Sequence, residues 1–255
     1  MCCIDRLKSK PKAAPKIVSP RREKTLRIML LIGALSLAYC AHAIERKPIL
    51  QVDVNALTTE TQVMAGGANS IDVVWWIPVE FWEATLRQSG DVPESQVDQM
   101  LGVLQNHTVL GVVQADISPF GAFRFFDKDK VMGGLKVQAI DAAGKLQTIS
   151  HTEPVDPDMR LLLDQMRPVL AQAMGNLGEN FYFFPLPAFD DEGERISSPY
   201  ESGRLLVTLQ RGEAHSSLEI EMPIDSLFVP RICPNGKPAH VSWAYCPWSG
   251  KKLQQ

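Results

Sequence analysis

Carboxylate and imidazole side chains are the groups in this sequence that could bind a metal ion or transfer a proton. Two acidic runs, Asp127–Lys130 and Asp190–Glu194, have the composition of cation-binding loops, but Met132 occupies the position at which a calcium loop requires glycine. Acidic runs of this kind more often form solvated turns. The histidines that follow residue 43 have no carboxylate or cysteine at a diagnostic spacing: His107, His151, His215 and His240. We therefore expect no metal and no cofactor.

Local motifs for catalysis do not occur in the sequence. There is no G-x-S-x-G nucleophile elbow, no H-E-x-x-H zinc motif and no glycine-rich phosphate loop. We accordingly predict no catalytic residue. An active site assembled from scattered carboxylates and histidines would leave no local motif, so a hydrolase stays open as the alternative.

The strongest remaining feature is a cluster of four aromatic residues, Trp75, Trp76, Phe81 and Trp82. Residues 73–77 are apolar on both strand faces, and the residues that follow have helical spacing. These periods place the cluster in the hydrophobic core. Trp76 is the predicted exception, because its ring would be exposed if one face of the strand were uncovered. It would then bind a protein or a small apolar ligand.

The first 43 residues differ in composition from the rest of the chain. A basic, proline-rich stretch is followed by an apolar run at Ile28–Tyr39, and Ala41 and Ala43 fit the small positions of a signal-peptidase site. The apolar run has 12 residues, whereas a membrane-spanning helix needs about 20. The pattern predicts a signal peptide over residues 1–43, cleaved before Ile44. The protein is then exported, periplasmic or secreted, without stable membrane insertion after cleavage.

Three other interpretations of this segment stay open. The apolar run could be retained as an uncleaved anchor. Cys40 stands in a sequence that resembles a lipobox, although Tyr39 is bulky where a small residue is expected. Arg21-Arg22 resembles a twin-arginine signal, but the residues behind the pair lack the usual apolar side chain.

Cleavage would change the charge of the protein. Residues 1–43 hold nine Lys and Arg and two Asp and Glu, so residues 44–255 keep 17 basic and 27 acidic side chains, a net charge of −10 against −3 for the whole chain. An acidic surface repels phosphate backbones and anionic lipid headgroups. We therefore expect no nucleic-acid partner.

Only two of the five cysteines follow residue 43, namely Cys233 and Cys246. In an oxidising compartment such an even pair more often forms a bridge than two free thiols. The pair is therefore predicted to be a disulfide. Trp243 and Trp248 lie close to it in the sequence, and we expect them to pack this end of the chain onto the preceding domain.

The sequence around the two cysteines, CPNGKP from Cys233 and YCPWSGKKL from Tyr245, resembles the paired C-P-x-C-G knuckles of zinc ribbons. The second thiolate of each knuckle is absent, with Ser249 at one of these positions and His240 as the only further donor. Two thiolates do not close a structural zinc site. The resemblance implies a degenerate zinc ribbon over residues 231–255, in which a disulfide replaces the metal.

Hydrophobic periodicity predicts about three helices among seven or eight short strands. The helices begin at Pro78, at Pro93 and, with Asp156 as N-cap, at Pro157, and Pro168 should bend the last one. The strands are expected over residues 49–54, 73–77, 107–118, 122–126, 135–149 as a hairpin, 180–189, 204–210 and 216–224. This pattern favours an α+β domain with a mainly antiparallel sheet over residues 44–230, followed by the tail.

The leader, the acidic charge and the missing catalytic motifs together favour a non-catalytic protein. We expect an exported binding or assembly protein of the cell envelope. An exported hydrolase with a scattered carboxylate and histidine site is the alternative.

Overall fold

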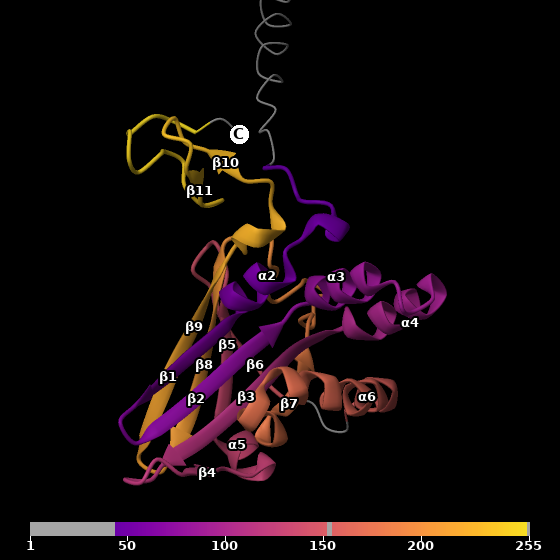
Figure 1. The fold of residues 1–255 in the computed structure, drawn as a ribbon, viewed down its shortest axis with the longest axis vertical. Coiled ribbons are helices and arrows are strands. Elements are labelled where there is room, and N and C mark those ends of the chain that lie inside the picture. The colour runs from indigo at the N-terminus through magenta and orange to yellow at the C-terminus, as the bar shows by residue number, and fades with distance from the viewer. Residues whose placement is uncertain (1–43, 152–154, 254–255) are drawn as a thin grey trace, which may run out of the picture. The chain divides into compact units, whose positions relative to one another are not determined.

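The computed structural model describes residues 44–151 and 155–253 of the 255-residue chain. The predicted signal peptide, residues 1–43, lies outside the described residues. Residues 44–255 form one unit, in which two antiparallel sheets are accompanied by a group of helices (Figure 1). The predicted α+β class with mainly antiparallel strands is confirmed.

The first sheet has five strands and is built around β3 (His107–Ile117). β2 (Ser70–Ile77) pairs with one edge of β3, and β1 (Gln62–Gly67) extends the sheet beyond β2. Two strands share the other edge of β3: β7 (Tyr182–Pro187) pairs with its first half and β4 (Phe123–Phe125) with its last residues. β2 and β3 are buried along most of their length, so the centre of this sheet lies inside the protein.

The second sheet has four antiparallel strands in the order β6-β5-β8-β9. They are β5 (Leu135–Ile140), β6 (Leu146–Ile149), β8 (Gly203–Arg211) and β9 (Ala214–Met222). Buried residues alternate with partly or fully exposed residues along β8 and β9. One face of this sheet therefore packs on the core while the other faces solvent.

The described residues contain five α-helices, three of which were predicted. α3 (Val79–Ser89) and α4 (Glu94–Leu104) each begin directly after a proline, a residue suited to helix starts because it has no N–H to leave unpaired. α6 (Pro157–Ala173) is capped by Asp156, whose side chain accepts hydrogen bonds from two backbone N–H groups of the first turn.

Helix α6 packs on the core through an apolar stripe with helical spacing. Four members of the stripe are buried, namely Met159, Leu162, Leu163 and Leu170. The fifth, Met166, is partly buried. Pro168 lies inside the helix, where it cannot donate the usual backbone hydrogen bond.

A strand was predicted over residues 49–54, the segment that leads into helix α2 (Val54–Thr61). That prediction was wrong: a 3₁₀ helix, η1 (Ile49–Gln51), precedes α2. The side chain of Asp53 accepts hydrogen bonds from two N–H groups of the first turn of α2, and Leu57 is fully buried. Capping and burial together outweigh the strand preference of the β-branched residues in this stretch.

The remaining elements are short. They are α5 (Lys128–Gly134), η2 (Gly175–Asn180), η3 (Asp225–Leu227), and the paired strands β10 (Arg231–Ile232) and β11 (Pro238–Ala239).

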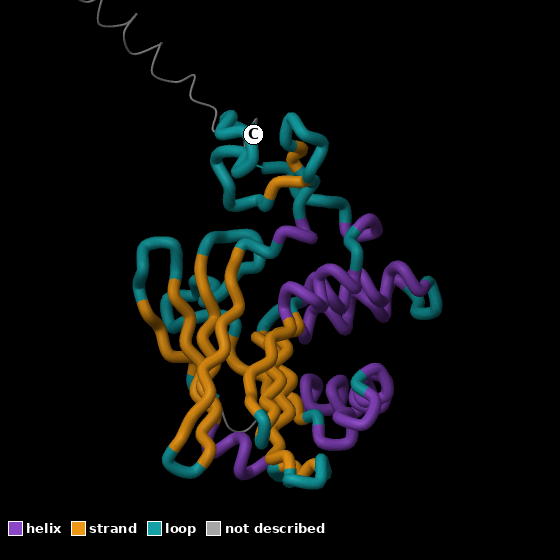
Figure 2. The backbone as a smooth tube through the Cα atoms, turned by 60° about the vertical axis from the view of Figure 1, so that its left-hand side comes forward, coloured by secondary structure: helices purple, strands orange, loops and turns teal. Residues whose placement is uncertain are grey.

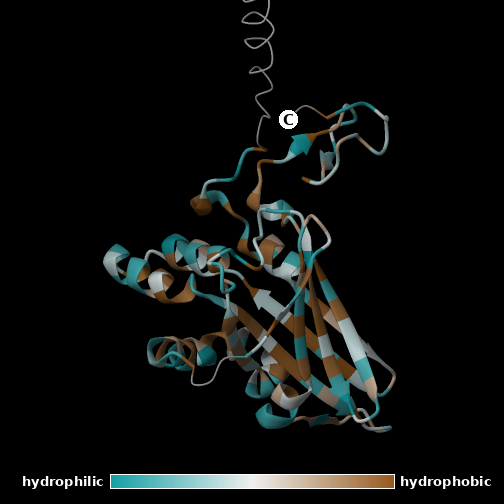
Figure 3. Cartoon of the chain, turned by 180° about the vertical axis from the view of Figure 1, so that it is seen from behind, coloured by the Kyte–Doolittle hydropathy of each residue, from teal (hydrophilic) through white to brown (hydrophobic). Residues whose placement is uncertain are grey.

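The elements form three layers. The two sheets face each other, and α3, α4 and α6 cover the outer face of the first sheet (Figure 2). Hydrophobic residues concentrate along the strands, whereas the outer faces of the helices are more hydrophilic (Figure 3). One large hydrophobic cluster runs through both interfaces between the layers.

Close packing at the centre of the first sheet depends on a glycine in β3. The ring of Phe181 lies directly on Gly111: a Cβ atom built on this glycine would be 2.0 Å from the ring, and Phe181 is fully buried. A glycine inside a strand marks such a close approach.

Candidate functional site

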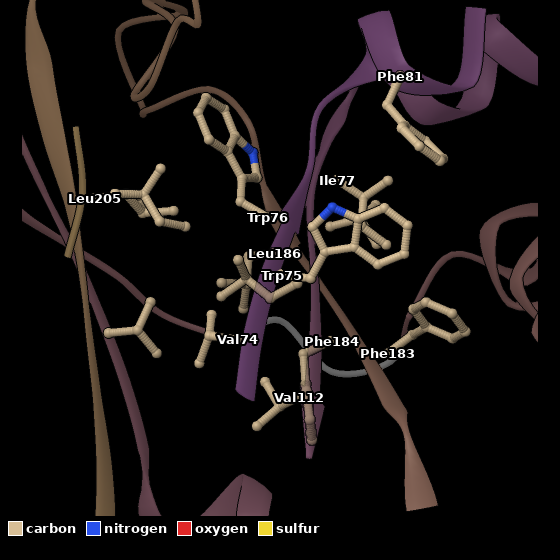
Figure 4. Close-up of a cluster of buried hydrophobic side chains, with 14 of the residues drawn as sticks. Val74, Trp75, Trp76, Ile77, Phe81, Val112, Phe183, Phe184, Leu186 and Leu205 are labelled. Carbon is tan, nitrogen blue, oxygen red and sulfur yellow. The ribbon is translucent and has the colours of Figure 1, made fainter. Parts of the chain in front are cut away.

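The predicted ligand-binding residue Trp76 is buried, so the expectation of an exposed ring was wrong. Only 2% of its surface is exposed, and its ring projects toward Leu205 of the second sheet (Figure 4). The neighbouring Trp75 projects to the opposite side, toward Phe81 of α3. Trp82 is buried as well. The second sheet covers the strand face on whose exposure the prediction for Trp76 depended, and the whole aromatic cluster belongs to the core, as its periods predicted.

The first residue of each acidic run stabilises the local backbone through hydrogen bonds. Asp127 caps α5, a helix that was not predicted, and accepts a hydrogen bond from the N–H of Lys130 at 2.8 Å. Asp190 closes a turn, accepting from the N–H groups of Glu192 and Glu194. Among residues 44–151 and 155–253, no group of three or more His, Cys, Asp or Glu side chains is placed to hold a metal ion.

One groove beside β7 brings a histidine near a carboxylate. It is lined by His107 and Asp156, among others. The Asp156 carboxylate is already engaged as the cap of α6, and the ring Nδ1 of His107 lies 3.1 Å from the carbonyl oxygen of Val103. The described lining residues include no serine, threonine or cysteine that could act as a nucleophile. Both His107 and Asp156 thus have local partners in the backbone.

A group of charged side chains around the buried Asp72 joins the two sheets. Arg211 of β8 donates to Oδ1 of Asp72 on β2 at 2.6 Å, and its other Nη donates to Asp116 on β3. The second oxygen of Asp72 accepts from the hydroxyl of Ser216 on β9. The Arg211 guanidinium also lies over the ring of Phe126, 4.9 Å from its centroid. We call these residues the inter-sheet clasp. Each charged group is paired inside it, so its role is structural.

A second buried carboxyl, Glu80 in the first turn of α3, lacks such pairing. Its Oε2 has no hydrogen-bond partner among the described residues. Burial raises the pKa of Glu80, against the opposing effect of the nearby Arg195 and Arg46. Burial, followed by the charge of Glu80, also raises the pKa of Tyr200 to about 12. Protonation of Glu80 is therefore linked to the stability of the fold.

The C-terminal tail, residues 231–253, is held together by the predicted disulfide. Cys233 and Cys246 are bridged, with 5.7 Å between their Cα atoms. Each cysteine opens a similar turn: its N–H donates to the carbonyl oxygen of a lysine, Lys237 in the first turn and Lys251 in the second, at 2.8 Å in both. The tail has a small core of its own, made of the two cysteines, Ala239 and Leu253.

The tail is also attached to the body of the protein, residues 44–230. Asp225 in η3 accepts a hydrogen bond from the N–H of Val241 at 2.6 Å, and the Val241 side chain enters the main core. The guanidinium of Arg231 donates to three carbonyl oxygens of the following loop, those of His240, Val241 and Trp243. These contacts hold the loop between the two turns in a defined shape.

Large apolar side chains on the tail point to solvent. The exposed fractions are 60% for Ile232, 39% for Trp243, 59% for Tyr245 and 51% for Trp248. The two tryptophans were expected to pack the tail onto the body, and this was wrong. They contact each other instead, with ring centroids 6.1 Å apart, and Lys237 lies over the ring of Trp248 at 5.0 Å. We call these exposed residues together with Lys237 the tail surface.

Charge is divided unevenly between the tail and the body. Residues 231–255 contain four basic side chains and no Asp or Glu, so residues 44–230 carry 13 basic and 27 acidic side chains, a net charge of −14. The four are Arg231, Lys237, Lys251 and Lys252. The net charge of −10 for residues 44–255 does not reveal this division. The signal that could have found it in the sequence is the absence of any acidic residue after Asp225.

No family model, no curated protein and no solved structure matches this chain. In the part of the chain that the structure describes, none of the helices combines the length and the apolar character needed to cross a bilayer.

Proposed function

We propose that this chain is an exported, non-catalytic binding or assembly protein of the cell envelope, and that the tail surface is where it contacts its partner. Export is supported by the order of basic, apolar and small residues over residues 1–43. The bridged cysteines suit an oxidising compartment, where disulfides persist.

The exposure of Trp243, Tyr245 and Trp248 is the observation that carries this proposal. Aromatic side chains with a polar N–H or O–H group are enriched in binding surfaces, because they supply a large apolar area and one hydrogen bond. Here they stand on a segment that a disulfide and the hydrogen bonds of Arg231 hold in place. A surface that is already ordered loses little conformational entropy on binding.

The two turns of the tail also support the proposal that it is a degenerate zinc ribbon. In a ribbon, each knuckle opens with a cysteine and turns back through a glycine. Here Gly236 and Gly250 adopt the left-handed backbone conformation, with φ of 79° and 67°, three and four residues after the respective cysteines. The disulfide would then stand where the metal stood, and hold the same two turns together.

Cell fractionation tests the proposed function. The full-length chain is expressed in a bacterium that exports proteins through signal peptides, and the mass of the product reports whether it begins at Ile44. The tail variant Trp243→Ser with Trp248→Ser is compared with a control, Leu161→Ser with Val169→Ser, which removes two exposed apolar side chains from α6. We expect the wild type and the control to stay with the envelope fraction and the tail variant to be released.

Two results would contradict the proposal. Equal retention of the tail variant and the wild type would show that the tail is not the contact surface. A product kept in the cytoplasm with residues 1–43 intact would refute export.

A further inference from the structure

We infer that the partner of the tail surface is an anionic lipid bilayer, on which the tail lies without crossing it. This inference rests on the proposed function and names the partner of the same surface. It is carried by three observations: the mixture of residues on the tail, the charge of the body, and the place at which the chain enters the domain.

Aromatic side chains of the tail surface lie beside lysines of the tail. Lys237 lies over the ring of Trp248, and Trp248 contacts Trp243. Tyr245 pairs with Lys252 in an isolated β-bridge, so these two residues are neighbours. Tryptophan and tyrosine favour the headgroup region of a membrane, because one end of each ring system is apolar and the other is polar. Lysine side chains reach from such a position to the lipid phosphates.

The charge of the body would orient the protein on such a membrane. With a net charge of −14, residues 44–230 are repelled by anionic headgroups, whereas the tail, which has four basic and no acidic side chains, is attracted. The sequence-based expectation that an acidic protein avoids anionic lipid therefore holds for the body and reverses for the tail. The segment that an anionic membrane attracts is thus the one that carries the exposed rings of Trp243, Tyr245 and Trp248.

The first described residues of the domain lie beside the residues that precede the tail. Arg46 pairs with Phe228 in an antiparallel bridge, the N–H of Lys47 donates to the carbonyl oxygen of Leu227, and the N–H of Val229 donates to that of Glu45. The tail begins at Arg231, two residues after Val229. Ile44, to which the predicted signal peptide is joined in the precursor, therefore belongs to the segment that pairs with the residues just before the tail.

Binding to vesicles tests the inference with protein recovered from the envelope fraction. Sedimentation is measured with phosphatidylglycerol–phosphatidylcholine vesicles and with phosphatidylcholine alone. Because each lysine near an anionic surface strengthens binding by roughly fivefold, Lys251→Ser with Lys252→Ser should weaken binding to the anionic vesicles by about 25-fold. The control, Lys136→Ser with Lys145→Ser, removes two exposed lysines of the body and should bind like the wild type.

Tryptophan fluorescence gives a second measurement. Trp75, Trp76 and Trp82 are buried, so brominated lipids should quench only the emission of Trp243 and Trp248. Salt at about 1 M, where the Debye length is about 3 Å, should release the protein. A count of free thiols shows that each variant keeps its disulfide and hence its folded tail.

Equal binding to both kinds of vesicle, or unchanged binding of the lysine variant, would overturn the inference. A tail-dependent dimer in sedimentation without lipid, with no vesicle binding, would instead identify the acidic body of a second copy as the partner. If vesicles do not bind but envelope retention still depends on the tail, the lipid inference fails and the proposed function stands with a protein partner. If envelope retention does not depend on the tail, the proposed function itself fails.

Discussion

Neutralising Asp72 should lower the free energy of unfolding, because this residue forms the buried end of the inter-sheet clasp. Asp72 is fully buried, and both of its oxygens accept hydrogen bonds, one from Arg211 and one from Ser216. Asp72→Asn keeps the shape of the side chain and removes its charge. The guanidinium of Arg211 is then left with Asp116 as its only anionic partner.

The magnitude follows from the burial of the pair. Breaking a buried ion pair by removing one partner costs about 3–5 kcal/mol. The lower end applies here because Arg211 is 19% exposed and Asp116 still compensates it. For a domain of about 200 residues, each kcal/mol lowers Tm by about 2–4 °C. We therefore expect Asp72→Asn to lose about 3 kcal/mol of unfolding free energy and about 6–12 °C in Tm.

Urea and thermal unfolding of the two single variants, Asp72→Asn and Arg211→Gln, and of the double variant measure this effect. The double variant should cost less than the sum of the two single changes, since both break the same contact. The matched control is Glu219→Gln, which breaks the pair between Glu219 and Arg204 across β8 and β9 at 3.2 Å. These side chains are 40% and 48% exposed, so the control should cost less than about 1 kcal/mol. A loss below about 1 kcal/mol for Asp72→Asn would refute this account of the clasp.

Three further changes test other parts of the fold. Gly111→Ala forces a methyl group into the ring of Phe181 and should cost about 1–3 kcal/mol of unfolding free energy. Gly102→Ala in α4 meets no atom within 4 Å and should stabilise the protein by about 0.5–1 kcal/mol. Equal effects of the two changes in urea unfolding would contradict the close packing of Phe181 on Gly111. Because burial raises the pKa of Glu80 in the folded state, the stability of the wild type falls as pH rises through that pKa, whereas Glu80→Gln cannot ionise. The stability of the variant relative to the wild type should therefore rise between about pH 4 and pH 7. A gain that is independent of pH would contradict the linkage. Reducing the Cys233–Cys246 bridge should raise hydrogen exchange in the tail and leave the sheets protected, and a uniform rise would show that the tail and the body unfold together.

Most strands and the three long helices could be predicted because each is long enough for its period to be read. β2 and β3 are apolar on both faces, and α6 has a stripe with helical spacing. Helix α2 was missed because it is short and contains three threonines within eight residues, which have low helix propensity. It forms because Asp53 caps it and Leu57 is buried, and the burial of Leu57 depends on distant residues.

The arrangement of the strands was beyond the reach of local pattern. The division into two sheets places a cover over Trp76, and no periodicity within residues 73–77 reports whether a second sheet lies there. The clasp likewise joins Asp72 to Arg211 across 139 positions of sequence. By contrast, the disulfide could be predicted, since only two cysteines follow residue 43.

The tail surface and the disulfide depend on each other physically. The tail buries only the bridged cysteines, Ala239 and Leu253 in its own core, while Trp243, Tyr245 and Trp248 stay largely in solvent. So small a core contributes little hydrophobic stabilisation, whereas closing the loop of this disulfide contributes up to about 3 kcal/mol in the chain-entropy model. Without the bridge, little would fix the positions of the exposed rings, and the proposed lipid-binding surface would lose its shape. A reducing compartment would remove that stabilisation, so the proposed lipid binding requires the oxidising compartment that the proposed export would supply.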